Sequence, residues 1–84
     1  MYNIQFTERG FKDLKKITPE ARKRIIAKMV YFSKQSVPLH FADRLINFEI
    51  GQYRFRIGDY RVICDVEGDT LLILRVDHRR EIYK

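Results

Sequence analysis

Cysteine is almost missing from this 84-residue sequence, which contains only Cys64. An intramolecular disulfide is therefore excluded, and Cys64, His40 and His78 offer too few ligands at these spacings for a zinc site. Long apolar runs are missing too, so no segment should span a membrane, and the first residues lack the apolar core of a signal peptide. Repeats, low-complexity segments and linkers are also absent. We expect a cytoplasmic protein that uses no cofactor or metal.

The residues that are present fit one small globular domain over residues 1–84. Apolar residues make up 45% of the chain and charged residues 33%, which suits a folded protein with a modest core. Lysine and arginine exceed the acidic residues by 17 to 11, so the net charge is +6. This excess suggests a polyanionic partner, with nucleic acid first and an acidic protein second.

A short strand over residues 2–6 and two helices are predicted in the first half. Thr7 is a suitable N-cap for the first helix, in which Gly10 is expected to weaken the helix. Thr18-Pro19-Glu20 marks the start of the second helix, which should run to about residues 33–35. The short connection predicts an antiparallel helix hairpin. Its expected core-facing residues are Phe11, Leu14, Ala21, Ile25, Met29 and Phe32, with Ile26 and Val30 widening the stripe.

The second half predicts an antiparallel meander with strands at residues 53–57, 60–66 and 70–77. Residues 36–43 are expected to form a loop, and residues 45–49 either a short strand or a turn. The predicted fold class is therefore α+β. It has two layers, with an N-terminal strand, a helix hairpin and an antiparallel meander of three or four strands.

Two turns set the register of this meander. Gly58-Asp59 forms a two-residue turn, which places Arg56 directly opposite Arg61. For the second turn we prefer a three-residue loop at residues 67–69, because a two-residue loop would send Arg75 inward against the helices. With that loop the last strand directs Leu72, Leu74 and Val76 to the core and Leu71, Ile73, Arg75 and Asp77 to the open face.

Arginine is the most frequent charged residue on the predicted open face of the sheet. Like charges that face each other, as Arg56 and Arg61 do, destabilise a sheet by up to about 1 kcal/mol. Two interpretations stay open: a solvated basic face whose arginines lie over apolar side chains, and a phosphate-binding surface. We favour the second because the charge conflict recurs. The predicted set is Arg54, Arg56, Arg61, Arg75 and, if the strand continues, Arg79.

The C-terminal stretch DHRREIYK adds groups suited to acid–base chemistry. His78 titrates near neutral pH, Tyr83 can exchange a proton if nearby cations lower its pKa, and Arg79 can stabilise an oxyanion. Two alternatives remain. A chain end is more often a solvated terminus than a site, and strand alternation allows His78 to point into the core beside Tyr60.

The stretch YRFRIGDYRVICDVEGDTLLILRVDHRREIYK resembles the C-terminal half of the RelE/ParE toxin superfamily. The shared features are a basic Y-R/K-x-R/K-x-G-x-YR hairpin, an apolar strand and an ending close to HRREVY. The first strand and the helices match in order and length, so the resemblance covers essentially the whole chain and implies a RelE-like fold. RelE-type members cut messenger RNA, typically in the ribosomal A site, whereas ParE-type members poison DNA gyrase and lack the RNase residues.

The resemblance also implies site residues. Matched by motif, the cleavage positions of RelE-type members fall on Arg54, Arg56, Arg61, Arg79 and Tyr83, which favours the RNase branch. Arg54 and Arg56 stand where lysine is common, and arginine cannot accept a proton. We therefore assign catalysis to Arg61, Arg79, Tyr83 and Arg56, with His78 as a further acid–base candidate. The predicted RNA-binding residues are Arg54, Arg56, Arg75 and Arg80.

The partners implied by the resemblance are a cognate antitoxin, messenger RNA and the ribosome. A heterotetramer of toxin and antitoxin is one assembly that it allows. Two other functions remain open at this point: a ParE-type inhibitor of DNA gyrase, and a basic RNA-binding module without catalytic activity.

Overall fold

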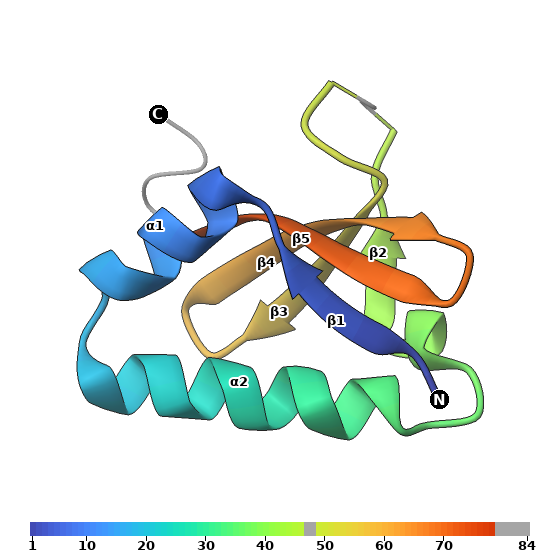
Figure 1. The fold of residues 1–84 in the computed structure, drawn as a ribbon, viewed down its shortest axis with the longest axis horizontal. Coiled ribbons are helices and arrows are strands. Elements are labelled where there is room, and N and C mark those ends of the chain that lie inside the picture. Colours follow the sequence, from blue (N-terminus) through green and yellow to red (C-terminus); the bar gives the residue numbers. More distant parts are fainter. Residues whose placement is uncertain (47–48, 79–84) are drawn as a thin grey trace.

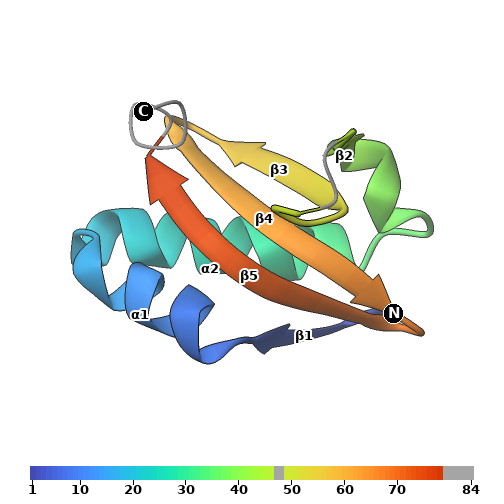
Figure 2. The ribbon, with the colours of Figure 1, turned by 90° about the horizontal axis from the view of Figure 1, so that it is seen from above.

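The computed structural model describes residues 1–46 and 49–78. Its sheet has the strand order β1-β5-β4-β3-β2, in which β2 to β5 form an antiparallel meander and β1 runs parallel to β5. Helix α2 lies under one face of the sheet and α1 lies beside β5 (Figures 1 and 2). The predicted α+β fold class is confirmed. The elements are β1 (Asn3–Phe6), α1 (Glu8–Lys16), α2 (Pro19–Ser33), the 3₁₀ helix η1 (Pro38–Phe41), β2 (Ala42–Arg44), β3 (Tyr53–Ile57), β4 (Tyr60–Glu67) and β5 (Thr70–His78).

Both helices begin at the predicted caps. The Thr7 hydroxyl oxygen accepts a hydrogen bond from the Gly10 N–H at 3.0 Å, and the Thr18 hydroxyl oxygen accepts one from the Ala21 N–H at 3.2 Å. The end of α1 is capped by a side chain that the sequence did not single out: Arg22 donates to the carbonyl oxygens of residues 14, 15 and 17. The first turn of α2 is thereby tied to the last turn of α1. In the described residues, no helix has the length and apolar character needed to cross a membrane.

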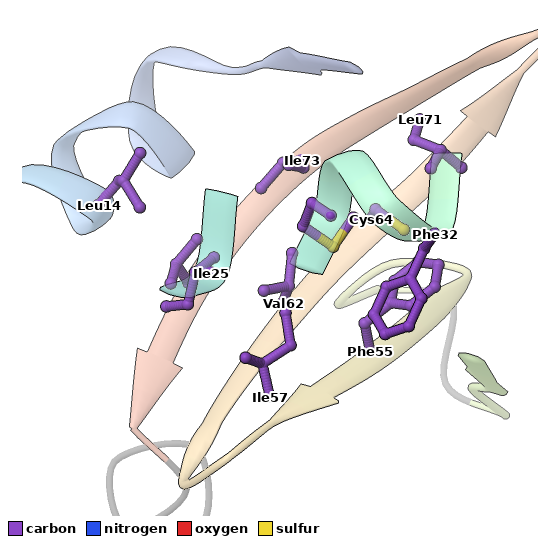
Figure 3. Close-up of a cluster of buried hydrophobic side chains, with 11 residues drawn as sticks. Leu14, Ile25, Phe32, Phe55, Ile57, Val62, Cys64, Leu71 and Ile73 are labelled. Atoms are coloured by element: carbon purple, nitrogen blue, oxygen red, sulfur yellow. The ribbon is translucent and has the colours of Figure 1, made fainter. Parts of the chain in front are cut away.

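The core lies between α2 and the sheet and is closed at one side by α1 (Figure 3). The rings of Phe32 on α2 and Phe55 on β3 stack with their centroids 5.1 Å apart. Phe11, Ile26 and Val30 were predicted to face this core, but they are 50%, 42% and 38% exposed. The prediction was wrong because α1 meets the edge of β5 and α2 meets the sheet along a narrow stripe. The buried residues include Leu14, Ile25, Met29, Phe32, Phe55, Val62, Cys64, Leu71 and Ile73.

The register of β5 differs from the predicted one. The β4–β5 turn has two residues, with Glu67 opposite Thr70, so Leu71 and Ile73 face the core instead of Leu72 and Leu74. Arg75 nevertheless stays outside, because the register shifts by one residue at this point: Cys64 faces Ile73, whereas Ile63 faces Arg75. Leu74 is therefore the extra residue of a β-bulge. The prediction assumed unbroken alternation, and the bulge removes the conflict that had argued for a longer loop. Val76 is buried as predicted.

The segment between α2 and β3 is more ordered than the predicted loop. It contains η1 and β2, and β2 pairs with β3. Residues 49–52 rise over the face of the sheet opposite α2 (Figure 1). Gln52 holds them there, since its N–H donates to the Asp65 carboxylate at 2.9 Å and its amide oxygen accepts from the Val66 N–H at 2.9 Å. Gly51 then lies so close to Ile63 that Ile63, although it points to the face opposite α2, is only 2% exposed.

Gly10 allows α1 to approach the edge of β5, although the sequence had suggested only a weaker helix. A Cβ atom at this position would lie 2.4 Å from the backbone oxygen of Ile73. We expect Gly10→Ala to lower the free energy of unfolding by about 2 kcal/mol, because overpacking against backbone exceeds the gain in helix propensity of about 1 kcal/mol. Urea unfolding measures the loss.

Gly68→Ala is the matched control for this substitution. Apart from Gly68 and its two chain neighbours, no atom of residues 1–46 or 49–78 lies within 4 Å of the added methyl group, and the left-handed φ of 59° is the source of strain. Its cost should be about 1 kcal/mol. If Gly10→Ala is as stable as the unsubstituted chain, this result contradicts the close approach of α1 to β5.

Candidate functional site

Three arginines lie on the open face of the central strands. The structure confirms that Arg56 on β3 faces Arg61 on β4, and Arg54 lies two residues before Arg56 on the same face. The next strand places Asp77 directly opposite Arg61. We call Arg54, Arg56 and Arg61 the arginine row.

One carboxylate that the sequence did not single out, that of Asp43, lies beside the arginine row. One oxygen of Asp43 on β2 accepts a hydrogen bond from Arg54 Nη2 at 3.2 Å and forms an ion pair with Arg56, whose Nε lies 3.0 Å away. This contact offsets the repulsion expected between the facing arginines. Asp43 was overlooked because its segment was predicted to be a loop, whereas pairing of β2 with β3 places it opposite Arg54. The open face is therefore not a bare basic surface.

Arg75 is held in a polar tie between α1 and β5. An oxygen of Asp13 accepts from Arg75 Nε at 2.8 Å and from the Val76 N–H at 3.1 Å, and Asp77 accepts from Arg75 Nη2 at 3.1 Å. The hydrogen bond to Asp13 raises the pKa of Arg75, against the opposing effect of burial. β1 pairs with β5 only as far as Ile73. Beyond that point the Asp13 carboxylate, in place of a neighbouring strand, accepts the hydrogen bond of the Val76 N–H. An RNA contact of Arg75 stays a prediction, and this structural tie argues against it.

His78 lies in the position that the alternative interpretation described. It faces Tyr60 across β4 and β5, with ring centroids 5.4 Å apart in an edge-to-face arrangement. Its imidazole is half-buried at the end of β5. Figure 2 shows this end of β5 beside the β3–β4 turn. Arg56 and Arg61 flank that turn at the end of β3 and the start of β4. The predictions for Arg79, Arg80 and Tyr83 fall outside the described residues.

The excess positive charge is located in the helical part of the chain. Residues 8–34 contain nine basic and three acidic residues, whereas the remaining residues contain eight of each. The whole net charge of +6 therefore comes from the segment of α1 and α2. The sheet contributes arginines whose charge is balanced by carboxylates.

Cys64 is fully buried, and burial, with a smaller contribution from Asp65, raises its pKa from 9.0 to about 12. The neutral thiol is thus favoured in the folded state. The resulting stabilisation is complete below pH 9 and is lost as the pH rises toward 12. We expect a loss of about 2 kcal/mol in unfolding free energy between pH 9 and pH 10.5 from this group.

Denaturant unfolding at both pH values measures this loss, with Cys64→Ala as the reference. The variant has no thiol to ionise, so its stability should fall less over the same range. Equal slopes for the two proteins would show that Cys64 is not the cause.

This chain is similar to known proteins over almost its whole length. The family model described as the ParE toxin of the type II toxin–antitoxin system, parDE, matches residues 4–83. Toxin RelG of Mycobacterium tuberculosis is 36% identical over 88 residues, covering 99% of this chain and 97% of the relative. Toxin RelE3 of Methanocaldococcus jannaschii is 35% identical over 82 residues, covering 95% and 93%.

The fold is also similar to solved structures. The toxin–antitoxin complex RelBE2 from Mycobacterium tuberculosis contains a chain that superposes with a TM-score of 0.76 at 29% identity, covering 93% of this chain and 98% of that one. The similarity in sequence and the similarity in fold therefore indicate the same family. This chain therefore belongs to the RelE/ParE family of toxins from type II toxin–antitoxin systems.

Proposed function

We propose that this toxin is an endoribonuclease that cleaves messenger RNA in the ribosomal A site, with the RNA 2′-OH as nucleophile and without a metal ion. The observation that carries the proposal is the direct facing of Arg56 and Arg61. They lie at the end of the sheet from which the chain continues to Arg79 and Tyr83. The relatives named RelG and RelE3 support the RelE-type function over the ParE-type alternative.

Cleavage by the 2′-OH makes three demands on the protein. A base must accept the 2′ proton, cations must stabilise the additional negative charge on the phosphoryl oxygens, and an acid must protonate the leaving 5′ oxygen. The 2′ oxygen forms a bond to phosphorus as the bond to the 5′ oxygen breaks. The products are a 2′,3′-cyclic phosphate and a 5′-OH.

The residues of this chain can meet each demand. Arg61 and Arg56 stabilise the phosphoryl oxygens, and Arg54 positions the RNA backbone, because guanidinium groups bind phosphate through paired hydrogen bonds. In this proposal Tyr83 accepts the 2′ proton. The acid is Arg79 or His78.

Asp43 does not prevent this use of the arginines. The Arg56 side chain is 61% exposed and the Asp43 side chain 49% exposed. An ion pair this accessible to solvent contributes about 0–1 kcal/mol, so an RNA phosphate can take the place of the carboxylate. The Arg54 side chain is only 16% exposed. It is therefore better suited to positioning the RNA backbone than to moving with the phosphate during the reaction.

A cognate antitoxin is the second partner in this proposal. The similar structure RelBE2 is described as a toxin–antitoxin complex. We propose that an acidic or amphipathic segment of the antitoxin covers the arginine row. The complex is either one toxin with one antitoxin or a heterotetramer of the two. Charge complementarity should make the association fast and its rate sensitive to salt.

Expression in a bacterium tests the proposed function. The chain alone should stop growth, protein synthesis should fail before DNA replication, and co-expression of the antitoxin should restore growth. If replication fails first and DNA breaks accumulate while messenger RNA stays intact, the ParE-type function replaces the proposal. RNA binding without cleavage or arrest would instead identify a non-catalytic module.

A further inference from the structure

A polar cavity of about 540 Å³ opens between α1, the start of α2 and the carboxyl end of β5. Its cationic walls come from Arg9 and Lys16 on α1 and from Arg75 on β5. His78 also lines it, together with the acidic residues Asp13 and Asp77. A cavity with this lining is suited to an anion that accepts several hydrogen bonds.

The two carboxylates of the cavity are already engaged with other groups. Asp13 accepts from Arg75 and from the Val76 N–H, and Asp77 accepts from Arg75. The Lys16 side chain, by contrast, makes no ion pair or hydrogen bond to any residue in 1–46 or 49–78. Arg9 contacts Asp13 only at 3.5 Å and its side chain is 62% exposed. Both α1 cations are thus available to a ligand.

The cavity adjoins the arginine row. Two of its lining residues, Tyr60 and Asp77, are the neighbours of Arg61 along β4 and across β5. Neighbouring strands lie about 4.8 Å apart, and α1 packs on β5, the strand next to Arg61, through the Asp13–Arg75 ion pair. Figure 2 shows α1, the end of β5 and the β3–β4 turn at the same end of the molecule. A nucleic acid strand held at Arg61 can therefore place its next phosphate in the cavity.

We propose that this cavity is a phosphodiester subsite, in which Arg9 and Lys16 bind the RNA phosphate adjacent to the one that is cleaved. The inference rests on the proposed function in taking RNA as the ligand. Arg9 and Lys16 contribute affinity and register, and they do not touch the reacting atoms. The Thr18 hydroxyl on the cavity wall offers a further donor.

The test measures binding of a short single-stranded RNA whose 2′-OH groups are methylated, by fluorescence anisotropy over a series of salt concentrations. Arg9→Gln with Lys16→Gln should lower the slope of log affinity against log salt by about 0.7, the value for one phosphate of a single strand. This change corresponds to roughly fivefold weaker binding at 0.1 M salt. Lys16→Gln alone should weaken binding by about twofold, and it removes no contact within the described residues.

Lys23→Gln with Lys28→Gln is the matched control. Both lysines are exposed on α2, belong to the same excess of helical charge and do not line the cavity. If the subsite is correct, this double variant changes the salt slope and the RNA affinity clearly less than Arg9→Gln with Lys16→Gln does. Equal effects of the two double variants, or no RNA binding by the unsubstituted protein, would overturn the proposal.

A second arm separates a strand phosphate from a free anion. In this arm, inorganic phosphate is titrated and the NMR signals of His78 and Lys16 are followed. If phosphate shifts these signals but Lys16→Gln leaves the RNA affinity unchanged, the cavity is a site for a small anion and the phosphodiester subsite is wrong. The RNase proposal fails separately: if RNA occupies the cavity but ribosome-bound messenger RNA stays intact, the subsite stands and cleavage does not.

Discussion

Tyr83→Phe is expected to slow messenger RNA cleavage by about 10²–10⁴-fold with little loss of RNA affinity. The substitution removes the phenolic oxygen that we propose accepts the 2′ proton, and it keeps the ring. The loss should therefore fall on the rate constant of the chemical step, measured in single-turnover experiments with saturating toxin.

Tyr31→Phe provides the control for this prediction. Tyr31 is 52% exposed on α2, so the variant loses a hydroxyl group far from the arginine row. Its cleavage rate should equal that of the unsubstituted protein. Full activity of Tyr83→Phe would transfer the proton-transfer role to His78, and His78→Gln would then be the decisive variant.

Asp13→Ala should lower the free energy of unfolding by about 3 kcal/mol, the scale for breaking a buried ion pair. The Asp13 side chain is 7% exposed and joins α1 to Arg75 and to the backbone of Val76. Its removal leaves the Val76 N–H without its acceptor and Arg75 with Asp77 as its remaining carboxylate. Chemical denaturation measures the loss, and Asp13→Asn should fall in between because it keeps one acceptor oxygen.

Glu8→Ala is the control, because its carboxylate also pairs with a cation on α1. The Glu8 side chain is 82% exposed and lies 3.1 Å from Lys12. Its loss should cost no more than about 0.5–1 kcal/mol. If the two variants are equally stable, Asp13 does not hold α1 against β5.

Local sequence signals determine much of the fold. The caps at Thr7 and Thr18 depend on residues three positions apart, and the facing of Arg56 and Arg61 follows from the turn at Gly58-Asp59. The bulge at Leu74 has no such local signal. It occurs where Thr7 donates to the backbone oxygens of Ile73 and Leu74, so it depends on how α1 reaches the edge of β5.

The site shows the same division. Alternation along β3 and β4 predicts which face carries the arginines, because it is a property of each strand. Two of the carboxylates that contact arginines come from distant segments: Asp43 from β2 and Asp13 from α1. Their contacts require the pairing of β2 with β3 and the packing of α1 on β5, which residue spacing does not encode. A carboxylate close to a predicted arginine cluster is therefore recognised only in three dimensions.

The most direct test of messenger RNA cleavage uses the purified toxin with translating ribosomes, with cut positions and end groups mapped by primer extension and terminal labelling. We predict cuts within the A-site codon that leave a 2′,3′-cyclic phosphate and a 5′-OH. Arg61→Ala should be about a hundredfold slower. Intact messenger RNA under these conditions, or products that carry a 5′-phosphate, would contradict the proposed reaction.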